Sequence, residues 1–346
     1  MAPRRFGKTA LLQAVQSRLA DRSLAAYVNC LAVTGSPTFH DRVVEELLAV
    51  CEERFGRARL LLATWRDVLK RPVLGMLERL DEIGGSIKYV GEIRLKFRTR
   101  EVDERKLLES TFDFLEEFAQ EQGESVVLIL DEFQALASFG ELIFPLFKEK
   151  MDEQQRVTYI FSGSSLSLLS EVFGREGKSP LYQMVGRIFL QEIEPSIMKD
   201  FVRRRLEEVH GVDITDEALA LVSNLVGGIP YYVQKLGLEL ERQLLFAGEK
   251  TIEVSDVEAA FTNLLNELET DFQERWTTRF SEQQRAILHA LSGGPATSSE
   301  IAERIGTDAE NLTYNLRRLQ GAMILTKEDS RYRITDRVFA AWLNRL

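Results

Sequence analysis

The sequence predicts three structural parts: a parallel α/β domain, an all-helical domain and a terminal helix-turn-helix with a β-wing. Over the first ~190 residues, short apolar runs typical of buried strands alternate with amphipathic helical stretches, which indicates a mainly parallel sheet covered on both faces. From Ser196 to about Glu274 the hydrophobic residues recur only with the period of a helix. The remaining residues suggest a helix, a helix-turn-helix and two short strands in that order, which describes a winged helix.

Length and composition favour a soluble, multidomain protein. A chain of 346 residues suits two or three domains, and 45% hydrophobic with 28% charged residues is typical of globular proteins. The longest apolar run, Val126 to Leu130, is far shorter than the ~20 residues that cross a bilayer, so we expect a cytoplasmic protein without membrane contact. Two cysteines without a C-x-x-C pair exclude a disulfide framework and a zinc site. A net charge of -10 disfavours nucleic-acid binding over the whole surface but allows a local basic face.

The α/β part is predicted to end near Ile193. Alternation at period two around Gly91 predicts a hairpin insertion at about 83–99. The other predicted elements are a helix from the Gly7-Lys8-Thr9 turn to Leu19, a strand Leu24–Asn29, a helix 38–55, a helix 101–122, and strands Val126–Leu130 and Val157–Phe161. Predicted helices follow at 196–209, 216–226, 230–246 and 255–274.

A new helix is predicted after Ser281, because Gln284 stands three positions later and forms a capping box with it. Helices Ser299–Ile305 and Asp308–Gln320 and strands Ile324–Lys327 and Tyr332–Ile334 complete the predicted winged helix. We therefore place the domains at 1–194, 195–275 and 276–346.

Two motifs point to nucleotide chemistry. Gly7-Lys8-Thr9 matches the end of a Walker A loop, in which backbone N–H groups and a lysine hold phosphates and a hydroxyl binds Mg²⁺. About 120 residues later, the apolar run Val127–Leu130 ends in Asp131 and Glu132, as a Walker B strand does. Each motif alone also fits an ordinary turn, but both in this order, one opening a helix and one ending a strand, predict an ATP site.

The requirements of phosphoryl transfer to water indicate a role for each of the motif residues. Lys8 neutralises phosphate charge, Thr9 binds Mg²⁺, and Asp131 holds the ion through ordered water. Glu132 orients or deprotonates the attacking water. Ser162 and Ser164, which end the next strand, are either a polar sensor of the γ-phosphate or a simple Ser/Gly turn.

Several segments together resemble those of a known family. They are Ala2 to Leu12, Leu-Asp-Glu-Phe-Gln at 130–134, Phe-Ser-Gly-Ser at 161–164, Ser-Pro-Leu-Tyr at 179–182, Gly-Gly-Ile-Pro-Tyr-Tyr at 227–232, and Tyr-Arg-Ile-Thr-Asp at 332–336 with Trp342. With these segments the chain resembles the archaeal-type ATPases, a prokaryotic AAA+/STAND group. The resemblance implies a helical lid whose Gly228 and Pro230 approach the nucleotide, and an Arg187 that senses or completes the site in its own subunit or in a neighbour. The implied nucleotide-binding loop comprises Pro3, Arg4, Arg5, Phe6, Gly7, Lys8, Thr9 and Ala10. An alternative interpretation is that Arg187 is an ordinary solvated arginine.

The Walker A pattern is incomplete at the start of the chain. Its first glycine should fall at position 2, where Ala2 stands, and the loop should emerge from a buried strand of the sheet. We expect either that the native start lies upstream of Met1, with this first strand missing here, or that the chain binds ATP weakly. A restored start is then expected to raise the affinity for ATP.

The sequence leaves two classes of function open for ATP turnover. In the first, nucleotide state controls DNA binding by the helix Asp308–Gln320 and the wing, and residues 275–346 carry a local excess of positive charge. The candidate DNA contacts are Asn311, Tyr314, Asn315, Arg317, Arg318, Arg331 and Arg333. In the second, the winged helix binds a protein, self-associates or autoinhibits, and ATP sets a switch. A scaffold without turnover is a third interpretation.

Overall fold

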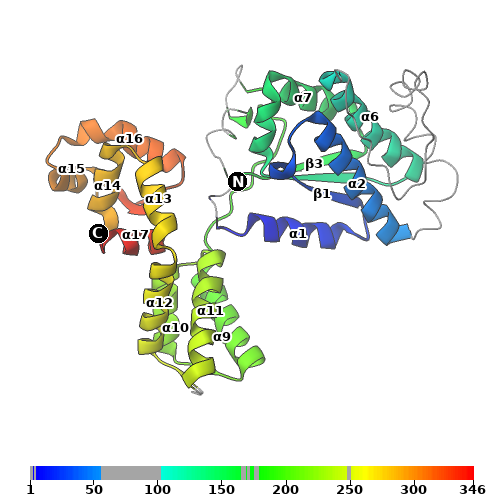
Figure 1. Cartoon of the computed structure of the whole chain (residues 1–346). Coiled ribbons are helices and arrows are strands. Elements are labelled where there is room, and N and C mark those ends of the chain that lie inside the picture. Colours follow the sequence, from blue (N-terminus) through cyan, green and yellow to red (C-terminus); the bar gives the residue numbers. More distant parts are fainter. Residues whose placement is uncertain are drawn as a thin grey trace. The chain divides into compact units, whose positions relative to one another are not determined.

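The structure is a computed structural model that describes residues 3, 5–55, 103–164, 169, 172–174, 179–247 and 251–346. It divides into two compact units, each described by itself (Figure 1). The first unit contains residues 8–188, and the second contains residues 189–346 together with the short segment 2–7. The hairpin predicted at 83–99 lies outside the described residues. The division of the chain at 194 and 275 stays a proposal.

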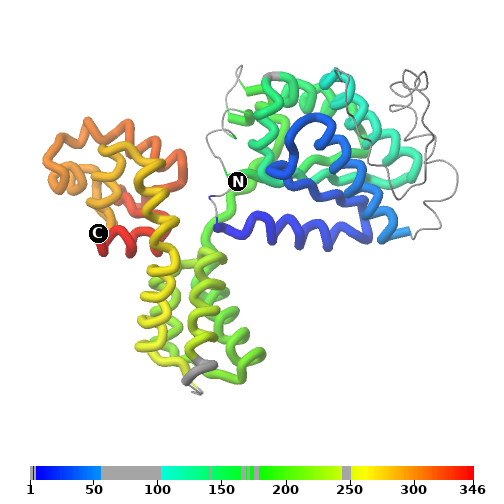
Figure 2. The backbone as a smooth tube through the Cα atoms, in the orientation of Figure 1, coloured from blue at the N-terminus to red at the C-terminus, as the bar shows by residue number. Residues whose placement is uncertain are grey.

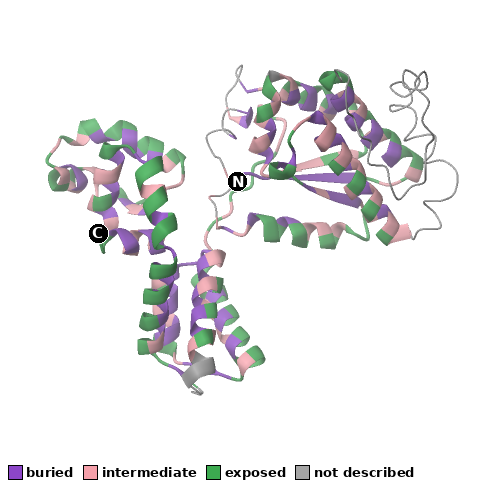
Figure 3. Ribbon diagram, viewed as in Figure 1, coloured by how far each residue is buried: buried purple, intermediate pink, exposed green. Residues whose placement is uncertain are grey.

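The described core of the first unit is a parallel sheet of three strands in the order β1-β2-β3. These are β1 (Leu24–Asn29), β2 (Val126–Asp131) and β3 (Val157–Phe161). Every residue of the central strand β2 is buried (Figure 3), which explains its continuous apolar run, because a parallel strand packs on both faces. In the β1–β2 register Asn29 pairs with Asp131, so both strands end at the same edge of the sheet.

Helices cover both faces of this sheet. Helix α1 (Lys8–Leu19) packs Leu12 on one face, against Ala25, Val127 and Ile129. The opposite face carries the larger core, formed with the following helices and 3₁₀ segments: α2 (Ser36–Phe55), α6 (Glu104–Gln122), α7 (Ile143–Glu153), η1 (Cys30–Ala32) and η2 (Phe133–Leu142). The two-sided cover of a parallel sheet confirms the predicted fold class.

In the second unit, the helices that run side by side (Figure 2) are α9 (Pro195–His210), α10 (Asp216–Val226), α11 (Pro230–Ala247) and α12 (Val254–Glu267). Helix α13 (Glu269–Arg279) follows α12, and the two-residue strands β4 (Asp213–Ile214) and β5 (Thr251–Ile252) pair with each other. The prediction of one helix over 255–274 was wrong in part. The helix is interrupted at Leu268, whose φ and ψ are -88° and -1°.

The chain ends in a winged helix, as predicted. It comprises α14 (Glu282–Ser292), α15 (Ser298–Ile305), α16 (Ala309–Gly321), β6 (Leu325–Glu328), β7 (Arg331–Ile334) and α17 (Arg337–Leu343). The capping box of Ser281 and Gln284 is present. Helix α17 was not predicted, and its buried Trp342 packs on Phe272 of α13 with ring centroids 5.6 Å apart. The helical part and the winged helix therefore share one apolar core.

Helices long and apolar enough to cross a bilayer are not found among the described residues.

Candidate functional site

The first candidate site lies where β2 ends. Asp131 is 1% exposed, and its carboxylate accepts three hydrogen bonds. The Thr9 hydroxyl donates to Oδ2 at 2.6 Å, the Tyr27 hydroxyl donates to the same oxygen at 2.9 Å, and the backbone N–H of Glu132 donates to Oδ1 at 2.9 Å. These donors offset the cost of burying a carboxylate. They also place the first turn of α1 at the carboxyl edge of the sheet, where α/β folds bind ligands.

The first turn of α1 is suited to an anion. Lys8, its first residue, is buried, and no acidic residue stands in that turn. The free N–H groups and positive dipole end of a helix N-terminus favour negative charge. Thr9 and Ala10 are exposed there. Burial, with the hydrogen bond to Asp131 next, raises the pKa of Tyr27, so this side chain remains a neutral donor.

Glu132 is held by residues from two other segments. The Ser164 hydroxyl donates to its Oε2 at 2.8 Å, and Nε2 of Gln134 donates to the same oxygen. Glu132 itself adopts the left-handed region, with φ 52° and ψ 41°. This conformation costs a non-glycine residue roughly 1–2 kcal/mol. The carboxylate therefore has a fixed orientation beside the Asp131 cluster.

Two buried polar atoms beside Glu132 have no hydrogen-bond partner among the described residues. They are the Ser162 hydroxyl and Oε1 of Gln134. The backbone of Ser162 is satisfied, since its N–H donates to Leu130 and its carbonyl accepts from Phe133. Gly163 lies against Gln134 so closely that an added Cβ would meet Oε1 at 2.2 Å. Buried unpaired polar groups are uncommon, and here they indicate a place for a polar ligand or water.

Other residues predicted for the nucleotide loop belong to the second unit. Phe6 is buried in its apolar core. Gly7 has a φ of 73°, and a Cβ placed there would lie 3.5 Å from Cγ of Pro230. The carbonyl of Arg5 accepts a hydrogen bond from the Tyr231 N–H at 3.3 Å. Pro3 is partly buried, whereas Arg4 lies outside the described residues.

Gly228 and Arg187 have structural contacts that the sequence did not predict. A Cβ on Gly228 would meet the Ile193 carbonyl oxygen at 2.0 Å, and Ile193 N–H donates to the Gly228 carbonyl at 2.9 Å. The close approach at this glycine is therefore to the protein's own backbone. Arg187 donates to the carbonyl of Phe173 rather than to the Asp131 or Glu132 carboxylates.

The predicted DNA contacts fall into two groups. Asn311, Tyr314, Arg317 and Arg318 are exposed on α16. Asn315 is buried and donates to Oε1 of Gln283 at 2.6 Å, so its amide supports the domain interior. The wing arginines are paired within the unit: Arg331 with Glu300 at 2.7 Å, and Arg333 with Glu328 at 3.2 Å and Glu192 at 3.5 Å.

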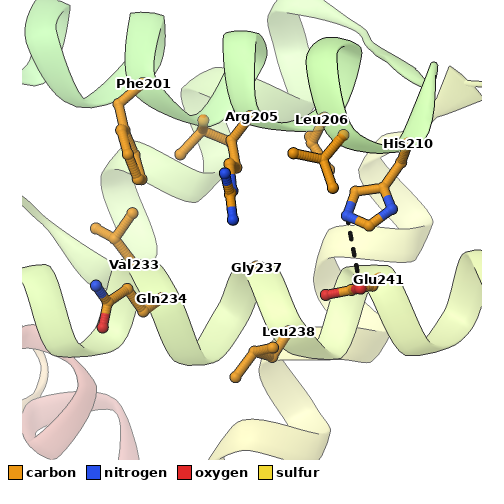
Figure 4. A pocket seen from close by; sticks show the side chains of 11 residues that line it. Phe201, Arg205, Leu206, His210, Val233, Gln234, Gly237, Leu238 and Glu241 are labelled. Atoms are coloured by element: carbon orange, nitrogen blue, oxygen red, sulfur yellow. Dashed lines mark ion pairs between the residues drawn. The ribbon is translucent and has the colours of Figure 1, made fainter.

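A groove of about 400 Å³ lies between α9 and α11 (Figure 4). Its lining is mostly apolar and includes Phe201, Val233 and Leu238. Nε2 of His210 lies 3.6 Å from the Glu241 carboxylate at one end. The groove contains none of the residues predicted to bind nucleotide, and an apolar lining does not suit a triphosphate.

The sequence analysis does not predict Tyr27 or Gln134 as site residues. Tyr27 stands in an apolar strand, although a tyrosine two residues before the end of a parallel strand can turn its hydroxyl to the ligand edge. Gln134 stands two residues after Glu132, and this spacing is the sequence signal that marks it.

The described residues include no group of three or more His, Cys, Asp or Glu side chains placed to hold a metal ion. A metal at the Asp131 cluster would instead take the Thr9 hydroxyl oxygen directly and the Asp131 carboxylate through water. Such hard oxygen ligands, completed by water and phosphate, are those that Mg²⁺ prefers.

Comparisons with known proteins agree with this fold. Residues 281–328 match a helix-turn-helix domain family. The solved structure of the Walker-type ATPase of Pyrococcus abyssi has a TM-score of 0.67 at 20% identity, over 100% of this chain and 89% of that one. The Aeropyrum pernix ORC2 protein in its ADPNP-ADP complexes has a TM-score of 0.59 at 13% identity, over 99% and 86% of the two chains. A search of curated proteins found no match.

Residues 2–236, well over half of the chain, match the family described as an ATPase domain predominantly from Archaea. The Lys8–Thr9 turn and the buried Asp131 that it meets lie inside this range. The chain therefore belongs to this ATPase family and carries a C-terminal helix-turn-helix domain.

Proposed function

We propose that the chain binds ATP with Mg²⁺, hydrolyses it, and uses the nucleotide state to control DNA binding by the winged helix. The observation that carries the ATP site is the hydrogen bond between Thr9 and Asp131, which joins two motifs 122 positions apart. The solved Aeropyrum pernix relative with bound ADPNP and ADP supports a nucleotide ligand for this fold.

Thr9 and Asp131 fit the role of magnesium ligands, Thr9 directly and Asp131 through water. Their hydroxyl and carboxylate oxygens already lie 2.6 Å apart. A bound Mg²⁺ would be held by these two residues and would supply positive charge against the phosphates. Lys8 adds a second positive charge at the start of α1, and the N–H groups of this turn donate to the phosphates.

Glu132 is proposed to act on the attacking water. As the water oxygen bonds to the γ-phosphorus and the bond to the ADP oxygen breaks, the carboxylate orients the water and accepts its proton. Ser164 and Gln134 hold the carboxylate, which restricts the directions from which it accepts. The unpaired Ser162 hydroxyl is proposed to contact the γ-phosphate or that water.

The remaining contacts complete this proposal. Pro3, Arg4, Arg5, Phe6, Gly7 and Ala10 supply the loop whose backbone surrounds the phosphates. Gly228 and Pro230 are proposed as lid contacts, since a Cβ placed on Gly7 would lie 3.5 Å from Cγ of Pro230. Arg187 is proposed to complete the site in its own subunit or in a neighbouring one.

Steady-state phosphate release with Mg²⁺ tests this site. Lys8→Ala should lower the rate at least about 100-fold, since removing one preorganised charge from phosphoryl transfer costs that much or more. Lys106→Ala, which changes an exposed lysine of α6 that pairs with Asp103, is the matched control. Equal rates in Lys8→Ala and wild type would end the proposal.

DNA binding is supported by the helix-turn-helix match and by the exposed face of α16. Arg317 and Arg318 have no ion pair among the described residues, and Asn311 and Tyr314 lie on the same helix. An anisotropy titration with duplex DNA at several salt concentrations tests this. Replacing Arg317 by Ala should weaken binding and lower the salt slope by about 1. Arg203→Ala, which removes an arginine of α9 that pairs with Asp216 and is not a candidate DNA contact, should leave the slope unchanged.

A protein partner or self-association is the second candidate. It is favoured by the ion pairs that occupy Arg331 and Arg333, which leave the wing few free charges for phosphates. The overall charge of -10 agrees with it. Absent DNA binding, together with a nucleotide-dependent mass change in sedimentation, would select this candidate.

A further inference from the structure

Arg5 stands three positions before Lys8, yet its side chain is packed in the second unit. Its Nη1 donates to the Tyr232 hydroxyl at 2.5 Å, and Nη2 pairs with the Asp271 carboxylate. The guanidinium lies 5.0 Å from the ring centroid of Tyr231 and 5.3 Å from those of Tyr232 and Phe272. A planar cation surrounded by rings and a carboxylate is strongly held in one position.

The Tyr232 hydroxyl continues this contact to the terminal helix. It donates to Oδ2 of Asp336 at 2.7 Å, and Nη1 of Arg275 donates to the same oxygen at 3.1 Å. The other oxygen of Asp336 caps α17 by accepting the Phe339 N–H at 2.9 Å. An unbroken chain of hydrogen bonds therefore runs from Arg5 through Tyr232 to the first turn of α17.

The same contacts fix the backbone ahead of Lys8. Arg5 has a φ of 76°, a left-handed conformation that costs a non-glycine residue energy and persists only where surrounding contacts hold it. Its carbonyl is also bound, by the Tyr231 N–H. Left-handed residues such as Arg5 and Gly7 in a tight turn aim successive N–H groups to one side, which makes a concave site for anions.

We infer that Arg5 is a positioning residue that couples nucleotide binding to the terminal helix α17 through Tyr232 and Asp336. This inference rests on the proposed nucleotide site. The side chain holds the loop backbone in its anion-binding turn, so the clamp and a bound nucleotide stabilise each other. Such coupling is reciprocal: nucleotide strengthens the cap of α17, and loss of the clamp weakens nucleotide binding by the same factor.

Two variants separate coupling from simple structural damage. Tyr232→Phe removes the shared hydroxyl and keeps the ring. Asp336→Asn removes the charge and keeps an N-cap residue, because asparagine caps helices as well as aspartate does. Tyr332→Phe is the matched control, since Tyr332 is buried in the same unit and its hydroxyl has no hydrogen bond among the described residues.

The experiment is calorimetric titration with ADP and Mg²⁺, paired with hydrogen exchange of residues 336–343 with and without nucleotide. In wild type, ADP should slow exchange of the Phe339 amide. Tyr232→Phe and Asp336→Asn should bind ADP at least about fivefold more weakly and lose this slowing. Tyr332→Phe should match wild type in both measurements.

The outcomes are distinct. If wild type binds ADP and exchange at 336–343 does not change, or changes equally in Tyr232→Phe, the coupling is overturned while the nucleotide site stands. If wild type does not bind ADP, the proposed function fails and the coupling fails with it. Should Tyr232→Phe not fold, Asp336→Asn decides the question, because it leaves the whole Tyr232 side chain in place.

Discussion

The Ser164 hydroxyl donates to Oε2 of Glu132 at 2.8 Å, which joins the segment after β3 to the segment after β2. Gln134 donates to the same oxygen. A carboxylate held from two sides keeps one orientation, as a residue that directs an attacking water requires. The candidate site is therefore organised by the edge of the sheet as well as by the residues of the two motifs.

Replacing Glu132 by Gln keeps the side-chain shape and removes its capacity to accept a proton. Phosphate release should fall at least about 100-fold, the usual contribution of a general base. ADP affinity should change little, because Thr9 and Asp131 are untouched. Glu124→Gln, which alters an ion pair with Arg54, is the control and should retain wild-type turnover.

Gly163→Ala tests whether the position of Gln134 matters. The added Cβ would meet Oε1 of Gln134 at 2.2 Å, so the amide must leave Glu132. Turnover is expected to fall roughly tenfold or more, as when a hydrogen bond that orients a catalytic group is lost. Gly186→Ala is the matched control, because in the described part of the chain no heavy atom beyond its two chain neighbours lies within 4 Å of a Cβ there. Equal turnover in both variants would exclude a role for Gln134.

The two thiols should be unreactive in the folded protein. Cys30 and Cys51 are 0% and 1% exposed, and burial raises the pKa of each to about 12. Because the thiolate is the reactive form, neither should react with a disulfide reagent at pH 8 within minutes. Both should react after unfolding. A fast-reacting thiol in the native protein would contradict the described packing.

The burial of His40 predicts that the stability of the fold depends on pH. Its Nδ1 lies 2.9 Å from the Thr111 hydroxyl, which itself donates to the Leu107 carbonyl, so Nδ1 donates and the buried ring is neutral. Burial lowers the pKa of His40 from its ordinary 6.5. Below that pH the unfolded chain binds a proton that the folded chain does not.

The free energy of unfolding should therefore be highest above about pH 6.5 and should decline as the pH falls toward 5.5. Burial also raises the pKa values of Asp41 and Glu46, whose contributions have the opposite sign and belong to lower pH. Urea unfolding of wild type and His40→Gln at pH 7.5, 6.5 and 5.5 measures the difference. If the free energy of unfolding changed with pH to the same extent in both proteins, His40 would not be buried in its neutral form.

The elements with strong local signals were predictable. Val126–Leu130 is apolar throughout because β2 is buried on both faces, and Ser281 with Gln284 caps α14 as their spacing indicated. The break at Leu268 was not predictable, since no glycine or proline marks it and α13 packs on α17, which lies far along the chain. Periodicity detects an amphipathic face but not the element that packs on it.

The site was predictable only in part, for the same reason. The pairing of Thr9 with Asp131 follows from motif order on a parallel sheet. The hydrogen bonds of Tyr27 and the clamp on Arg5 depend on contacts between residues 104 and 227 positions apart, which no local pattern encodes. Asn315 was predicted as a DNA contact from residue type, whereas the winged-helix packing buries it.

The most direct test is the binding of a non-hydrolysable ATP analogue, measured by calorimetry with Mg²⁺ and again with excess chelator. Thr9 and Asp131 as magnesium ligands predict that affinity falls at least about tenfold without Mg²⁺ in wild type, and that Thr9→Ala and Asp131→Asn remove most of this difference. Binding that is absent, or that is equal with and without Mg²⁺ in all three proteins, would contradict the proposed site.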